Sequence, residues 1–392
     1  MSTRRGALAV ALAALAAVVA AVATTTLRGQ PAATAPPSAS AAPTTAAAAN
    51  TTGPRVVFAH PVALDVVPGG GPVTTNAYDS FEIVAPGGAR QSRAVAGLAV
   101  GTVVFDGIDR VAYWRRAGVT RSPVELSGVH EVVVMNVLSG QERVMLTLKD
   151  ERSNGELLWT ADRRSLVVSV RTAPGISGTP QNRLLLVDTD TGATRVLHAA
   201  AGDVAIGPFY ADHQIVAGIR GPSYVVLDVI TGAVRTAPAR VRSSFMSEYS
   251  DLRSSADGIV VELLRRFESD AGPLWIWNVR DAGTDIAKVD RRGISDPILW
   301  PGRAEIVFSA TRGTGSGVGL TALDYQSGRT RPLTSPPGPI RVLEVDMTGR
   351  FALVQTDSGM HLFERTGDEL KARPDLSFVA ESILLPLGIV SP

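Results

Sequence analysis

Apolar and polar positions follow one pattern that recurs along most of this chain. Each unit has an apolar strand after a tight turn, a second apolar strand that ends near Asp or Asn, a turn with Gly, and a polar strand. Short strands that repeat every roughly 40 to 50 residues are typical of a β-propeller. The clearest copies of the second hairpin are VVVMNVLSGQERVML (132–146), LLLVDTDTGATRVLH (184–198), YVVLDVITGAVRTAP (224–238) and LTALDYQSGRTRPLT (320–334).

The number of hairpins predicts the number of blades. Three further copies, at 81–95, 275–289 and 360–374, bring the total to seven. An apolar segment at 377–390 has no hairpin after it, which is explained if strands from the two chain ends complete one shared blade. We therefore expect an all-β fold, a β-propeller of seven four-stranded blades. Six or eight blades remain alternatives if residues 55–67 form strands of their own.

The first 23 residues have the pattern of an export signal. Arg4 and Arg5 precede an uncharged run of Ala, Val and Leu at 6–23, which ends in an Ala-Val-Ala match for signal peptidase. The run also just reaches the minimum length for a membrane-spanning helix. The pattern thus predicts an extracytoplasmic protein, either anchored by this N-terminal hydrophobic helix or secreted after cleavage near Ala23.

A linker follows at 24–54. It is rich in Ala, Thr, Pro and Ser, and Arg28 is the only charged residue before Gly53. Such a segment has too little bulky apolar surface to offset the entropy of ordering, so we expect a disordered tether. The β-propeller domain is then expected to occupy residues 55–392.

Composition narrows the partners and the chemistry. Of 392 residues, 45% are hydrophobic, and 38 Lys and Arg against 37 Asp and Glu leave a net charge of +1. A near-neutral chain has no global field for nucleic acid, so a nucleic-acid partner is not expected. The chain has no Cys, which excludes disulfides and thiolate metal sites.

Two motifs suggest chemistry but fit the repeat better. Asp188, Asp190 and Gly192 resemble the opening of a calcium loop, yet other units keep only one acidic or amide side chain there. We therefore expect a turn in which Asp accepts backbone N–H groups and Gly takes positive φ. The glycine run at 313–319 joins two predicted strands rather than a strand and a helix, which favours a hairpin connection over a phosphate loop.

No catalytic, cofactor-binding or metal-ligating residue is assigned. The five His residues are scattered among different units without ligand spacing, and no G-x-S-x-G elbow occurs. We interpret the five Trp residues as packing groups within the blades.

One segment departs from the repeat, RVRSSFMSEYSDLR at 240–253. Insertions in a propeller are displayed on one rim, where partners meet the axial funnel. An ordinary polar crossover between blades is the alternative. The candidate partner-contact residues are Phe245, Glu248, Tyr249, Asp251 and Arg253.

The phrase LWTADRRSLV (158–167) resembles the TolB-type, WD40-like propeller repeat, with its tryptophan, hydroxyl residue, aspartate and apolar strand. The resemblance covers about residues 81–390, although Trp300 stands before a Pro-Gly turn and other copies lack the tryptophan. It implies a propeller of a class that is often exported and serves as a protein-binding platform, while other members are accessory domains of peptidases.

Two functions from different classes follow from these features. We favour a non-catalytic, extracytoplasmic propeller that acts as a binding or scaffold module for a protein, peptide or cell-envelope ligand. It is expected to be monomeric and to meet the membrane only through its N-terminal segment. The alternative is an exported propeller enzyme, such as a lactonase, glycosidase or quinoprotein-like protein, with its site in the axial funnel.

Overall fold

In the computed structural model, the described residues lie almost entirely in β-strands, from β1 (Arg55–Pro61) to β27 (Leu385–Val390). Within the parts that it describes, no helix is both long enough and apolar enough to cross a membrane. The predicted signal or anchor segment lies outside the described residues, as does the linker up to residue 52. The structure describes residues 53–62, 77–117, 129–148, 151–172, 181–201, 204–211, 213–219, 224–239, 250–254, 258–264, 274–278, 284–289, 294–310, 319–336, 338, 340–373 and 384–392.

Strands from both chain ends share the first blade. Its strands are β27 (Leu385–Val390), β1 (Arg55–Pro61), β2 (Ala77–Val84) and the start of β3 (Arg90–Phe105), with the short 3-10 helix η1 (Pro86–Gly88) before β3. This pairing confirms the predicted shared blade. It also places β1 inside that blade rather than in an eighth one.

Strand β3 continues into the second blade. Ala99 and Val100 of β3 pair with both β2 and β4, so the first two blades form one seven-stranded sheet. The other strands of blade two are β4 (Arg110–Ala117), β5 (Val129–Asn136) and β6 (Glu142–Leu148).

The remaining five blades are separate four-stranded antiparallel sheets. Blade three contains β7 (Glu151–Trp159), β8 (Ser165–Thr172), β9 (Gln181–Asp188) and β10 (Thr194–Ala201). Blade four contains β11 (Val204–Ala211), β12 (Gln214–Ile219), β13 (Tyr224–Asp228) and β14 (Val234–Thr236). Blade five contains β15 (Ser250–Ser254), β16 (Ile259–Leu264), β17 (Leu274–Asn278) and β18 (Thr284–Val289). Blade six contains β19 (Ile294–Trp300), β20 (Glu305–Ala310), β21 (Leu320–Asp324) and β22 (Thr330–Pro332). Blade seven contains β23 (Ile340–Val345), β24 (Phe351–Thr356), β25 (Gly359–Thr366) and β26 (Glu369–Ala372).

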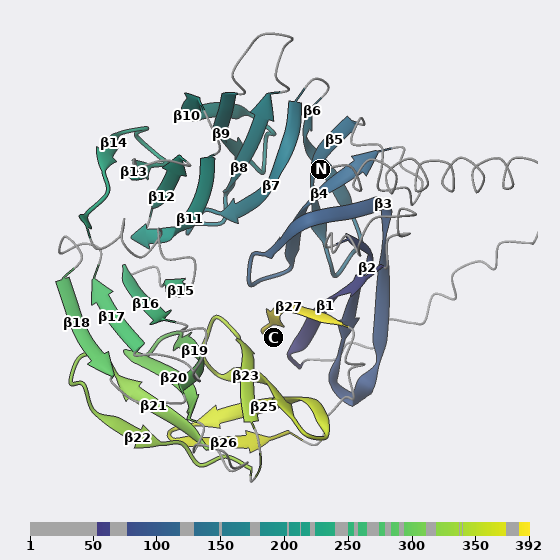
Figure 1. Cartoon of the computed structure of the whole chain (residues 1–392). Helices are drawn as coiled ribbons and strands as arrows, with labels where there is room; N and C mark the ends of the chain where they lie inside the picture. The colour runs from purple at the N-terminus through teal and green to yellow at the C-terminus, as the bar shows by residue number, and fades with distance from the viewer. Residues whose placement is uncertain are drawn as a thin grey trace, which may run out of the picture. The chain divides into compact units, whose positions relative to one another are not determined.

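The seven blades close into a ring (Figure 1). Their innermost strands, from blade one to blade seven, are β27, β3, β7, β11, β15, β19 and β23. Each of these strands contacts the next, and β23 contacts β27. The predicted seven-bladed propeller is therefore confirmed.

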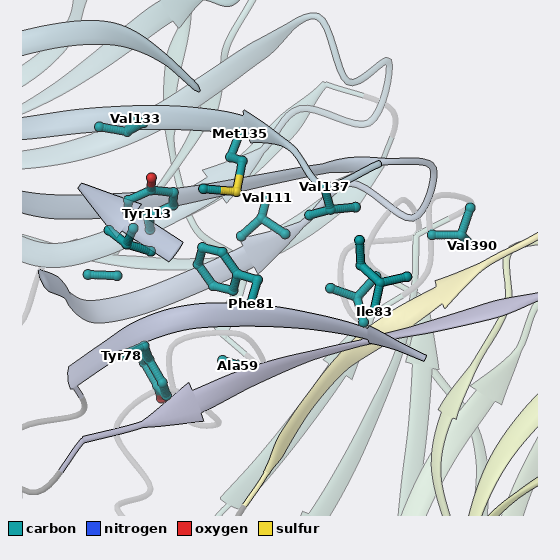
Figure 2. Close-up of a cluster of buried hydrophobic side chains, with 13 residues drawn as sticks. Ala59, Tyr78, Phe81, Ile83, Val111, Tyr113, Val133, Met135, Val137 and Val390 are labelled. Carbon is teal, nitrogen blue, oxygen red and sulfur yellow. The ribbon is translucent and has the colours of Figure 1, made fainter. Parts of the chain in front are cut away.

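Apolar side chains from neighbouring blades form the core. In β8, Val167 packs toward blade four, whereas Leu166 and Val168 pack toward blade two. A strand that is covered on both faces is apolar at successive positions, which explains the uninterrupted apolar runs in the sequence. Figure 2 shows the cluster between blades one and two, where Phe81 and Tyr113 lie together with ring centroids 5.3 Å apart. Val390 from the C-terminal strand joins the same cluster.

The recurrent Asp–Gly turn has the predicted geometry. The Asp188 carboxylate accepts the N–H groups of Asp190 and Thr191 at 3.0 and 2.7 Å, and Gly192 has φ of 75°. The Thr191 hydroxyl donates to the same carboxylate at 2.7 Å, and this hydrogen bond, followed by that from the Thr191 N–H group, holds the pKa of Asp188 below its usual range. Asp228 and Asp324 make the same turn in their own blades.

An arginine on the outermost strand of several blades joins it to the next blade. Arg143 of β6 donates to the Thr189 carbonyl at 3.2 Å, and Arg195 of β10 donates to the carbonyls of Val229 and Ile230 at 2.5 and 2.9 Å. Arg143 and Arg195 each stand three residues after the glycine of the turn. The repeat therefore encodes contacts between blades as well as the turns within them.

Candidate functional site at the axis of the ring

The seven innermost strands surround the axis, and its two ends differ. The turns that follow these strands, including residues 106–109, 160–164, 301–304 and 346–350, lie at what we call the turn end. The innermost strands begin at the opposite end, which we call the loop end. Because six blades are ordinary copies of one unit, features that depart from the repeat at either end are the candidates for function.

Pairing between the innermost strand and its neighbour is interrupted in six of the seven described pairs. The register shifts between Val100 and Val103 in β3, between Ser153 and Leu157 in β7, and at equivalent places in β11, β19, β23 and β27. The β15 pair keeps one register throughout. A bulge bends a strand, so the innermost strands depart at these places from a regular sheet.

An ion pair lies at the bulge of blade six, near the loop end. Asp296 of β19 has φ of 49°, a left-handed conformation that is uncommon for a residue with a side chain. Its carboxylate lies 2.8 Å from the Arg341 guanidinium on β23, the innermost strand of blade seven. The Arg341 side chain is 52% exposed and that of Asp296 is 25% exposed. A strained acidic residue with a solvent-accessible cation beside it is a candidate for contact with a polar ligand.

Two of the five candidate partner-contact residues lie on the innermost strand of blade five. Phe245, Glu248 and Tyr249 lie outside the described residues. Asp251 and Arg253 belong to β15, where they are paired with Leu263 and Val261. The end of the segment is thus a regular blade strand and not a loop, and it is the innermost strand of blade five. The periodicity missed this strand because three of its five residues are Ser or Asp and only Leu252 is apolar.

The turn end is crowded by Met347 from blade seven. Its sulfur accepts from Nη2 of Arg163 in blade three, and a Cβ added to Gly107 in blade two would lie 2.5 Å from it. The three turns that carry these residues therefore meet at the axis. Met347 is 44% exposed, and the neighbouring Ile108 is 48% exposed.

Acidic side chains at the turn end are used within their own turns. The Asp106 carboxylate, which is buried, accepts three backbone N–H groups and lies 2.8 Å from the Arg110 guanidinium. Burial opposes ionisation of Asp162, but hydrogen bonds from the Thr160 hydroxyl and from backbone N–H groups outweigh it and lower the pKa of Asp162. The carboxylates of Asp106 and Asp162 are therefore used to hold their own turns.

The histidines lie apart from one another. His60 pairs with Asp79 at 3.3 Å, His213 pairs with Asp228 at 3.1 Å, and His361 hydrogen-bonds Ser358 at 2.8 Å, each in a different blade. Within the described ranges, no three His, Asp or Glu side chains gather closely enough to hold a metal ion. Four of the five tryptophans are buried between strands, as the sequence predicted.

Sequence reasoning missed Asp296, Arg341, Ile108 and Met347. One signal was present for the first, because Asp296 precedes a proline inside a strand pattern, and Pro in a strand indicates a bulge or an edge. The other residues look like ordinary members of turns and strands. They become candidates only because closure of the ring brings them next to residues of other blades.

No protein-family model matches this sequence, and none of the curated proteins matches it. Several solved structures resemble it. TolB from Acinetobacter baumannii has 15% sequence identity and a TM-score of 0.40; the match covers 75% of this chain and 66% of the TolB chain, just under two thirds of its length. A putative 6-phosphogluconolactonase from Bacteroides uniformis has 10% identity and a TM-score of 0.47, covering 86% of this chain and 99% of the other.

A third likeness is to the β-propeller domain of the Trilobed protease from Pyrococcus furiosus. It has 16% identity and a TM-score of 0.45, covering 78% of this chain and 90% of the other. Similarity this low carries no argument about activity. TolB is among the solved structures that resemble this chain, as the sequence predicted. The strand pairing itself makes the chain a seven-bladed β-propeller.

Proposed function

We propose that this protein is a non-catalytic, extracytoplasmic binding module whose ligand contacts the loop end of the axis. The ligand is a protein, a peptide or a cell-envelope component with polar or charged groups. The observation that carries the proposal is the Asp296–Arg341 pair, which joins two innermost strands and stays accessible to solvent. The exported enzyme remains the competing function.

The position of this pair supports binding rather than simple stabilisation. An exposed ion pair contributes little to stability, typically about 0 to 1 kcal/mol, whereas a left-handed Asp costs on the order of 1–3 kcal/mol. The ion pair with Arg341 therefore does not by itself offset the cost of the left-handed conformation at Asp296.

The N-terminal pattern supports an extracytoplasmic location. Basic residues followed by the apolar run at 6–23 direct export, and the linker at 24–54 would hold the propeller away from a membrane if the run is retained. N-terminal sequencing of the exported protein separates the two forms. A chain that starts at Thr24 would exclude the anchored form, whereas an intact Met1 in the membrane fraction would support it.

Charge reversal on blade seven tests the binding site. Arg341→Glu places a second carboxylate beside Asp296, while Lys371→Glu reverses an exposed cation on the outermost strand β26 of the same blade. Both variants and the wild type are probed against arrays of peptides and cell-envelope glycans. We expect any ligand bound by the wild type to be weakened by Arg341→Glu at least about tenfold, and by Lys371→Glu no more than about twofold.

The same proteins are assayed for turnover of lactones and of oligosaccharides. Catalytic turnover that Arg341→Glu abolishes would replace the binding proposal with the enzyme. Equal loss in both variants, or no loss in either, would show that the loop end is not the binding site.

A further inference from the structure

The turn end of the axis carries a compact group of residues that the proposed function does not use. We call this group the axial turn patch and define it as Gly107, Ile108, Arg163, Arg303 and Met347. The residues come from four turns of blades two, three, six and seven. They lie at the end of the axis opposite Asp296 and Arg341.

Contacts between distant turns hold the patch together. Met347 contacts Gly107 and Arg163, which are far from it in the sequence. The blade-six turn packs on the same loop, since a Cβ at Gly302 would lie 3.8 Å from the Thr348 carbonyl. Below Met347, the Asp346 carboxylate accepts the Ser391 hydroxyl at 2.6 Å, so the last strand of the chain is tied to it as well.

The centre of the patch is apolar and accessible. Ile108 and Met347 expose 48% and 44% of their surfaces, and Met347 packs against Gly107, the residue before Ile108. Isolated exposed apolar residues need no explanation, but a neighbouring pair at the axis offers a place for an apolar side chain. Methionine is flexible and polarisable, so it adapts to different partners.

The rim of the patch is basic. Arg163, Arg164 and Arg303 form no ion pair within the described part of the chain, although the protein as a whole is nearly neutral. Asp106 and Asp346 are buried and bound to turn N–H and hydroxyl groups, whereas Asp162, beside Arg163, is exposed and its pKa is lowered. Arg163, Arg164 and Arg303 outweigh the Asp162 carboxylate, so a partner meets a net positive charge.

The backbone at Arg163 has an unusual conformation. Its φ is 60°, and Arg163 and Asp296 are the two described residues other than glycine with positive φ. The carbonyl of Arg163 accepts from Arg110 at 2.7 Å, which fixes this conformation while the side chain reaches Met347. Both strained residues thus lie at the axis, one at each end.

We infer that the axial turn patch docks an acidic segment of a partner protein, in which one apolar side chain is flanked by carboxylates. The apolar side chain packs on Ile108 and Met347, and the carboxylates meet Arg163 and Arg303. Met and Arg are enriched at protein–protein interfaces, and Arg is enriched among the residues that contribute most of the binding energy. This inference goes beyond the proposed function, because it concerns a different surface and a different chemistry.

The test uses the full chain and a peptide array. The peptides have about ten residues and one central leucine in a glycine and serine background, and they differ in the number of flanking Asp or Glu residues. We expect the signal to rise with the number of acidic residues, to fall when the leucine is replaced by glycine, and to weaken as salt is raised from about 0.05 to 0.5 M. A signal that does not depend on acidic residues or on leucine overturns the inference.

Two variants locate the binding. Arg163→Glu is expected to weaken the best peptide at least about fivefold. Arg329→Glu reverses an exposed arginine in an outer turn of blade six and is expected to change it by less than about twofold. Met347→Asp, which leaves every arginine in place, should also weaken it. An unchanged affinity in both Arg163→Glu and Met347→Asp would overturn the site.

Other occupants give different results. Vesicles of phosphatidylglycerol that bind the wild type and not Arg163→Glu, with no peptide bound, would indicate a membrane surface instead. Self-association that Met347→Asp abolishes would indicate a second copy. Loss of the peptide signal in Arg341→Glu but not in Arg163→Glu would place the peptide at the loop end, so failure of this inference and failure of the loop-end proposal can be told apart.

Discussion

Arg195 and Arg331 occupy the same place in two repeats, three residues after the turn glycine, but their contacts differ. Arg195 joins blades three and four by donating to two backbone carbonyls, those of Val229 and Ile230. Arg331 joins blade six to blade seven through the Asp368 carboxylate at 2.8 Å, and it also pairs with Glu305 of its own blade at 2.5 Å. The same repeat position therefore binds uncharged carbonyl acceptors in one interface and carboxylates in another.

The ionic network includes a buried arginine. Glu305 also lies 2.6 Å from Arg365, whose side chain is 0% exposed and lies over the Trp300 ring at 4.4 Å. The Trp300 indole N–H donates to the Gly349 carbonyl at 2.7 Å, which adds a further link between the same blades. A buried cation depends on its counter-charge far more than an exposed arginine depends on a carbonyl. The stability of the interface between blades six and seven should therefore depend more on charge than that of the interface between blades three and four.

Removing the charge of Glu305 should have the largest effect. Glu305→Gln keeps the shape of the side chain but removes the carboxylate 2.6 Å from the buried Arg365, which leaves Asp368 at 4.0 Å as its nearest counter-charge among the described residues. We expect the free energy of unfolding to fall by about 3 kcal/mol, measured by urea denaturation. Glu364→Gln is the matched control, because its partners Arg350 and Arg373 are accessible, and it should cost less than about 1 kcal/mol.

A double variant sharpens this result. Glu305→Leu with Arg365→Met removes both charges and leaves an apolar pair, so it should recover much of the stability that Glu305→Gln loses. If the double variant is no better than the single one, the buried charge is not the cause of the loss.

The contrast between these interfaces also shows what the sequence could predict. The Asp188 turn, the seven hairpins and the shared blade depend on neighbouring residues and on a repeated pattern, so they could be predicted. Arg195 and Arg331 are both visible as arginines after a turn glycine, but their partners lie in the next blade. The Asp296–Arg341 pair and the Met347 contacts depend in the same way on how blades meet, which no periodicity encodes.

Acid should weaken the two interfaces unequally. Burial opposes ionisation of Glu305, but hydrogen bonds from Arg331 and Arg365 outweigh it and hold its pKa below the usual range. A carboxyl with a lowered pKa in the folded state contributes stability above its ordinary pKa, and that stability is lost as the pH falls through the folded pKa. The difference in unfolding free energy between wild type and Glu305→Gln should therefore shrink between about pH 6 and pH 3. A difference that stays constant over this range would contradict a charged Glu305.

Replacing Arg195 should have the smallest effect and a different dependence on conditions. Arg195→Met keeps the aliphatic part of the side chain but removes the hydrogen bonds to the Val229 and Ile230 carbonyls, so we expect a loss of about 1.5 kcal/mol. Because the acceptors are uncharged, this loss should be the same at about 0.1 and 1 M salt and at about pH 6 and pH 3. Arg331→Met, measured in parallel, should lose less at the higher salt, since salt screens its exposed contact with Asp368. If Arg195→Met showed the same salt dependence as Arg331→Met, the acceptor chemistry would not distinguish the interfaces, and long-range charge across the ring would have to account for both.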